Sequence, residues 1–126
     1  KQKKWPYYDQ LIKLIKQNHP NLKIVIAPGP DEIEKAKKLD AVSILKEDKA
    51  ISISELAGLI KRSKFVVAND TGPAHMAAHL NVKGLSLFGS HTTAHKVSIE
   101  RENFKAIQVS DLKNLSAEKV FERLVL

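Results

Sequence analysis

The residue types best suited to chemistry follow one another in one short stretch, Asp70-Thr71-Gly72-Pro73-Ala74-His75. An apolar run at 65–68 precedes it, and an alanine-rich segment and a second apolar run at 84–88 follow it. This order predicts a strand, a tight polar loop, a helix and another strand. Pro73 suits the first turn of a helix, where free N–H groups and the helix dipole favour an anion. The stretch is therefore a candidate phosphate site.

A loop that binds a sugar diphosphate needs N–H donors, an acceptor for sugar hydroxyl groups and little bulk. Thr71 and Gly72 can offer backbone N–H groups, and Asp70 can accept from hydroxyl groups. His75, just inside the helix, can donate to a phosphate or orient the sugar. The alternative is purely structural, with Asp70 capping the helix and His75 packed against its neighbours. The residues by themselves leave both interpretations open.

Other elements are expected to position this loop. Strands are predicted at 23–27, 41–45, 65–68, 84–88 and 104–109. Helices are predicted at 7–18, 31–39, 52–63, 74–80 and 116–125, with a charged loop at 46–50 and an irregular segment at 90–101 that contains a helical turn near 96–99. Apolar strands that alternate with helices are typical of a doubly wound, Rossmann-like α/β fold with a mostly parallel sheet. Ligands of such sheets bind beyond the carboxyl ends of the strands, where the loops at 28–32 and 69–75 are expected.

The composition fits one domain spanning residues 1–126, with no internal repeat. The chain starts with Lys1 rather than Met, so we expect a piece of a longer protein. A formal net charge of +7 favours anionic partners, although a solvated lysine-rich surface accounts for most of it. The absence of cysteine excludes disulfides and thiolate metal sites.

Two histidine pairs, 75 with 79 and 91 with 95, have the i, i+4 spacing that a metal site can use. Met76 stands where a zinc protease helix needs glutamate, and no third ligand is evident. We therefore expect no metal and no cofactor. Trp5 is expected to pack under a helix rather than stack on a base. The basic and aromatic residues around Trp5, at positions 1–8, form only one short cluster. Such a cluster does not predict nucleic-acid binding.

The segment Asn69-Asp70-Thr71-Gly72-Pro73-Ala74-His75, its alanine-rich helix and the strand ending Leu87-Phe88-Gly89 resemble the signature of the heptosyltransferases, glycosyltransferase family nine. Lys3-Lys4-Trp5-Pro6 resembles the segment that opens the C-terminal half of that family. Gly29-Pro30-Asp31-Glu32 resembles its Gly-x-x-Glu turn. The motifs occur in the family's order and spacing, and the resemblance covers nearly the whole chain.

The resemblance implies the donor-binding C-terminal domain of a two-domain GT-B glycosyltransferase. Such an enzyme would transfer a sugar such as heptose from a nucleoside-diphosphate sugar to a lipopolysaccharide-type glycan. By resemblance, Asp70 contacts the donor sugar, and Thr71 and Gly72 bind the diphosphate with His75 beside it. Lys3 matches the family lysine that approaches the phosphates.

Glu32 matches the family carboxylate that takes the ribose hydroxyl groups. The family's general base comes from the N-terminal domain, so no catalytic residue is expected in this chain, and the isolated chain is expected to be inactive. Ser90-His91 replaces the family's Pro-Thr, which leaves the identity of the donor open.

The resemblance also implies a lipid-linked glycan acceptor, reached through the N-terminal domain. It further implies a cytoplasmic location with peripheral contact at the inner face of a bacterial membrane. The alternative function is a non-catalytic nucleotide-binding, phosphate-binding or interaction module.

Overall fold

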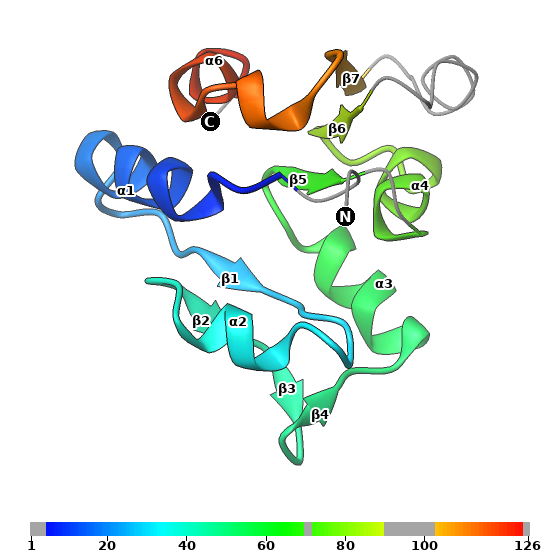
Figure 1. The fold of residues 1–126 in the computed structure, drawn as a ribbon. Helices are drawn as coiled ribbons and strands as arrows, with labels where there is room; N and C mark the ends of the chain where they lie inside the picture. The colour runs from blue at the N-terminus through cyan, green and yellow to red at the C-terminus, as the bar shows by residue number, and fades with distance from the viewer. Residues whose placement is uncertain (1–4, 70–71, 90–102, 125–126) are drawn as a thin grey trace.

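The computed structural model describes residues 5–69, 72–89 and 103–124 (Figure 1). The helices are α1 (Tyr8–Asn18), α2 (Ile33–Lys37), α3 (Ile53–Lys61), α4 (Gly72–His79) and α6 (Ala117–Glu122), with a 3-10 helix, η2 (Leu112–Asn114). The strands are β1 (Val25–Ile26), β2 (Val42–Ser43), β3 (Leu45–Lys46), β4 (Lys49–Ala50), β5 (Val66–Asn69), β6 (Gly84–Phe88) and β7 (Phe104–Gln108). None of these helices is long and apolar enough to cross a membrane.

The central sheet contains β5, β6 and β7 in that order, all parallel. Every residue of β6 is buried, as expected for a middle strand that is covered on both faces. Leu85 and Leu87 of β6 face a core that includes Val120 of α6 and Leu11 of α1. Phe88 faces the opposite core, which is built from α3 and α4. Helices therefore cover both faces of the sheet, and the predicted α/β class is confirmed (Figure 1).

Glycine is required at the start of β6. Gly84 pairs with Val66 on one side and Phe104 on the other. A Cβ atom at Gly84 would lie 2.6 Å from Cε1 of Phe104 and even closer to the carbonyl oxygen of Val66. The close approach of backbone and ring therefore excludes any side chain here.

Two short sheets accompany the central one. β1 and β2 pair in parallel, with Val25 opposite Val42, and α2 connects them. β3 and β4 form an antiparallel hairpin closed by Glu47 and Asp48, whose φ angles are 53° and 64°. Two positive φ angles in a two-residue hairpin loop match a type I′ turn. The prediction of a loop at 46–50 is therefore wrong. Lys46 belongs to β3, residues 47 and 48 form the turn, and residues 49 and 50 form β4.

Several predicted boundaries also change. The expected strand at 41–45 is divided between β2 and β3, and the expected helix at 31–39 contains only the five residues of α2. The Ser-x-x-Glu spacing at the start of the predicted helix 52–63 forms a capping box on α3: the Glu55 N–H donates to Ser52 Oγ at 3.2 Å, and the Ser52 N–H donates to Glu55 Oε1 at 2.9 Å. Ser116, at the start of the predicted helix 116–125, caps α6. The helical turn expected near 96–99 lies outside the described residues.

Candidate functional site

The carboxyl end of β5 and the beginning of α4 form the centre of the candidate site. β5 ends at Asn69 and α4 begins at Gly72, so only two residues of sequence connect them. Ala74, Ala77 and Ala78 are buried on the face of α4 that packs against the sheet. Because alanine side chains are short, α4 can lie close to the strands. Its positive end is therefore next to the carboxyl edge of the sheet, which suits an anion.

The two histidines of α4 lie away from its alanine face. His75 is half-buried and His79 is exposed. Within residues 5–69, 72–89 and 103–124, no group of three His, Cys, Asp or Glu side chains is placed to hold a metal ion. The expectation that this chain uses no metal stays a prediction.

Asn69 connects the β5–α4 loop to the start of the described chain. Its Oδ1 accepts a hydrogen bond from the Trp5 backbone N–H at 3.3 Å and another from the Tyr8 hydroxyl at 3.1 Å. Its backbone oxygen accepts from the buried Ser86 hydroxyl of β6 at 3.4 Å. Trp5 and Tyr8 are 64 and 61 positions from Asn69 in the sequence, respectively. Two distant segments of the chain therefore meet at the Asn69 side chain. We call Trp5, Tyr8 and Asn69 the Asn69 junction.

The junction is held firmly on its N-terminal side. Trp5 is only 3% exposed, and its indole N–H donates to the Leu115 carbonyl at 2.7 Å. Its ring meets Tyr8 edge-on, with centroids 5.0 Å apart. The prediction that Trp5 packs under helices is confirmed. The start of the described chain, at Trp5, is thereby fixed beside the end of β5.

The Tyr8 hydroxyl stays a donor under ordinary conditions. Burial raises the pKa of Tyr8 well above its usual value, because the phenolate would lose its hydration. A protonated hydroxyl can donate to the Asn69 oxygen, whereas a phenolate cannot. The junction is therefore insensitive to pH in the neutral range.

Glu32 lies at the start of α2, in the turn that follows β1. Its backbone N–H donates to the Gly29 carbonyl at 3.0 Å, and its side chain does not cap α2. The side chain is half-buried. The predicted turn before α2 is thus confirmed. The Glu32 carboxylate makes no capping hydrogen bond to the N-terminus of α2.

The structure describes part of the predicted site. Gly72 and His75 lie in the first four residues of α4, and Glu32 lies at the other parallel sheet, β1–β2. Lys3, Asp70 and Thr71 lie outside the described residues. Their roles stay predictions.

Sequence reasoning missed two contributors, Tyr8 and Ser86, and placed Asn69 in the predicted loop without a role. Tyr8 lies in the predicted helix at 7–18, where nothing in the sequence reveals its hydrogen bond. Ser86 is fully buried inside the strand GLSLF, and a polar residue in such a run is a signal of a specific hydrogen bond. Asn69 ends an apolar run in the same way, but its partners cannot be identified without the fold.

The sequence matches a known protein family and a known relative. The family model described as glycosyltransferase family 9 (heptosyltransferase) matches residues 1–124. The chain belongs to glycosyltransferase family 9. It is similar to lipopolysaccharide heptosyltransferase 1 of Campylobacter coli, with 29% identity over 83% of this chain and 33% of that protein.

Solved family structures have the same fold. The E. coli heptosyltransferase WaaC with ADP matches with a TM-score of 0.81 and 25% identity, over 96% of this chain and 39% of WaaC. The same enzyme with ADP-2-deoxy-2-fluoro heptose matches with a TM-score of 0.80 and 25% identity, over 97% of this chain and 38% of WaaC.

E. coli ADP-heptose lps heptosyltransferase II matches in fold, with a TM-score of 0.72 and 18% identity over 96% of this chain and 40% of that protein. The chain thus spans between a third and two fifths of its relatives. The predicted likeness to GT-B heptosyltransferases is confirmed.

Proposed function

We propose that this chain binds the nucleoside-diphosphate sugar donor of a glycosyltransferase that acts on a lipopolysaccharide-type glycan. The observation that carries the proposal is the β5–α4 connection of a family 9 chain, with Asn69 held by Trp5 and Tyr8 immediately before a helix N-terminus. The match to WaaC, which was solved with ADP and with an ADP-heptose analogue, supports a donor of the ADP-heptose type.

The diphosphate is assigned to the start of α4. Backbone N–H groups at the start of a helix have no partner within the helix, and the helix dipole adds a positive potential there. Gly72 and Thr71 contribute such groups, and His75 is one turn further along α4. Lys3 precedes the tethered Trp5 by two positions, so its cation is assigned to the same phosphates.

Two carboxylates take the sugars of the donor. Asp70 directly follows Asn69 and is assigned to the hydroxyl groups of the transferred sugar. Glu32, whose side chain does not cap α2, is assigned to the ribose hydroxyl groups. A carboxylate has two acceptor oxygens and can take two adjacent hydroxyl groups at once.

In the proposed reaction, an acceptor oxygen bonds to the anomeric carbon of the donor sugar while the bond to the diphosphate oxygen breaks. Negative charge grows on the leaving nucleoside diphosphate, and the helix end and Lys3 stabilise it. The acceptor proton goes to a base outside this chain. The isolated chain should therefore bind the donor without transferring its sugar.

The remainder of the protein is proposed to bring a lipid-linked glycan acceptor. For such an acceptor, we propose a cytoplasmic location with peripheral contact at the inner face of a bacterial membrane. The excess of basic residues is compatible with an anionic membrane surface.

Calorimetric titration of the full-length protein with ADP tests the proposal. Glu32→Ala and Lys3→Ala should each weaken the binding of ADP. Asp70→Ala should weaken the binding of ADP-heptose in a parallel titration, because ADP lacks the transferred sugar. Asp31→Ala and Lys13→Ala remove the same kinds of charge at exposed positions and should leave binding unchanged. A full-length protein that binds neither ADP nor ADP-heptose would contradict the proposal.

A second candidate is a non-catalytic nucleotide-binding, phosphate-binding or interaction module. Ser90-His91 in place of the family's Pro-Thr favours it, because this departure from the family motif comes two residues after the end of β6 in the sequence. The two candidates differ in turnover. Donor binding by the full-length protein, with no transfer to any lipopolysaccharide-type acceptor, would favour the module.

A further inference from the structure

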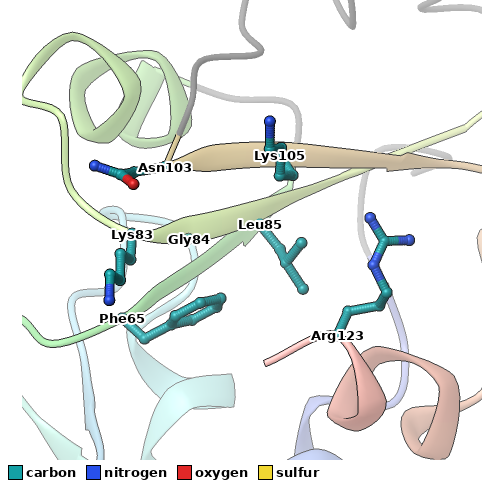
Figure 2. A pocket seen from close by; sticks show the side chains of 7 residues that line it. All are labelled: Phe65, Lys83, Gly84, Leu85, Asn103, Lys105 and Arg123. Carbon is teal, nitrogen blue, oxygen red and sulfur yellow. The ribbon is translucent and has the colours of Figure 1, made fainter. Parts of the chain in front are cut away.

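A cavity of about 360 Å³ lies at the amino edge of the central sheet, at the opposite ends of the strands from the donor site (Figure 2). Its apolar part is lined by Phe65, just before β5, and Leu85 of β6. Figure 2 shows these two side chains between Lys83 on one side and Arg123 on the other. We call this hollow the amino-edge cavity.

The polar lining of the amino-edge cavity is cationic. Lys83 precedes β6, Lys105 is in β7, and Arg123 follows α6, and all are exposed. Asn103 adds an amide, which is fixed at the rim because its Nδ2 donates to Asn81 Oδ1 at 3.2 Å. Among the described residues that line the cavity, none carries a carboxylate. Cations from separate elements thus lie around one hollow.

These cations differ from other lysines of the chain. Lys16, Lys37 and Lys46 approach carboxylates at 2.9, 3.7 and 3.5 Å, respectively. No ion pair joins Lys83, Lys105 or Arg123 to a carboxylate in the described part of the chain. An external anion would therefore reduce the mutual repulsion of these cations, which no described carboxylate neutralises by an ion pair.

A simpler explanation covers each cation separately. Arg123 is the C-cap of α6, where the negative end of the helix favours a positive charge. Lys83 and Lys105 are exposed, so hydration offsets much of their repulsion. This explanation does not account for their arrangement around one partly apolar hollow.

We propose that the amino-edge cavity is a phosphate-binding site, separate from the donor site. The guanidinium group of Arg123 can bind two phosphate oxygens side by side, and the lysines at the rim are point charges that raise the positive potential around the cavity. The phosphate can come from a soluble ion or from the head group of an anionic lipid. Both sources share this chemistry, and the apolar lining leaves room for the carbon skeleton of a lipid head group. The proposal does not depend on the identity of the donor.

The test compares two triple variants of the full-length protein that remove equal charge. Lys83→Ala/Lys105→Ala/Arg123→Ala removes the cavity cations. The control, Lys13→Ala/Lys35→Ala/Lys49→Ala, removes exposed lysines elsewhere. Far-UV circular dichroism verifies that both variants are folded. Lys105→Glu alone is a second test if the cavity triple variant does not fold.

One arm titrates inorganic phosphate and follows backbone amide shifts by NMR. The other arm measures co-sedimentation with vesicles of phosphatidylglycerol and phosphatidylcholine. In the wild type and the control, phosphate should shift the amides of Gly84, Leu85 and Lys105. Loss of the cavity cations should weaken binding in the responding arm roughly tenfold or more.

The arms also separate the sources. A cavity-dependent response to phosphate alone supports a soluble phosphate, and a response to vesicles, with or without phosphate, supports a lipid head group. Equal behaviour of the cavity variant and the charge-matched control in both arms would overturn the proposal.

Discussion

The two edges of the central sheet are built in different ways. At the carboxyl edge, Asn69 is fixed by hydrogen bonds from Trp5 and Tyr8, and a helix N-terminus follows at once. At the amino edge, Gly84 and Phe104 fix the backbone by close packing, while the cations around the cavity are exposed. The carboxyl edge therefore holds its polar groups in fixed positions, which suits specific contacts with a ligand. The amino edge has exposed cationic side chains, which attract an anion chiefly by charge.

The largest expected effect concerns the packing of the amino edge. Gly84→Ala would place Cβ 2.6 Å from the Phe104 ring and against the Val66 carbonyl. Because β5 backbone must shift to relieve this contact, we expect a loss of roughly 1–3 kcal/mol in the free energy of unfolding. Urea denaturation measures the loss.

Gly58→Ala is the matched control, since a Cβ at Gly58 meets no atom within 4 Å. Gly58 lies inside α3, where alanine should add about 0.5–1 kcal/mol of stability. If Gly84→Ala were as harmless as Gly58→Ala, the close packing described at this edge would be incorrect.

The next effect concerns the carboxyl edge. Tyr8→Phe removes one of the two described hydrogen bonds to Asn69 Oδ1 and should cost about 0.5–1.5 kcal/mol of stability. If the Asn69 junction positions the donor loop, the affinity for ADP should also fall. Denaturation and calorimetry on the same samples measure both quantities.

Tyr7→Phe provides the comparison for this prediction. It removes a hydroxyl that donates to the Lys113 carbonyl at 2.7 Å, away from Asn69. Its affinity for ADP should match that of the wild type. Equal losses of affinity in Tyr8→Phe and Tyr7→Phe would mean that the junction has no particular role in donor binding.

The smallest expected effect concerns Glu55 in the capping box of α3, which lies at neither edge of the central sheet. The hydrogen bond from the Ser52 backbone N–H holds the pKa of the exposed Glu55 carboxyl below its usual value. A depressed pKa in the folded state stabilises the protein above the unfolded pKa, about 4.3, and this contribution is lost as pH falls through the folded pKa.

Glu55→Gln keeps an acceptor but cannot titrate, so it should lack this acid-dependent loss. The pH dependence of the free energy of unfolding measures the difference. Identical acid profiles for Glu55→Gln and the wild type would contradict the depressed pKa.

Local signals predicted much of the fold. The Ser52–Glu55 capping box marked the start of α3, and the apolar runs on either side of Asp70–His75 marked β5 and β6. The β3–β4 hairpin was missed because Glu47 and Asp48 adopt positive φ angles without the glycine that usually signals such a turn.

Features that depend on distant residues could not be predicted in this way. The Asn69 junction joins residues 61 and 64 positions apart, and its hydrogen bonds exist only after the sheet and α1 have packed. The cations of the amino-edge cavity belong to separate elements, so they read as ordinary surface charge in the sequence. The motifs of the proposed donor loop, by contrast, are contiguous and could be recognised directly.

NMR mapping of the proposed ADP site on the full-length protein distinguishes the two edges of the sheet. ADP should shift the amides of Asn69, Gly72 and Ala74 at the carboxyl edge and leave those of Glu47 and Lys49 in the β3–β4 hairpin unchanged. Shifts confined to Gly84 and Leu85, with none at Asn69 or at the start of α4, would contradict the proposed donor site.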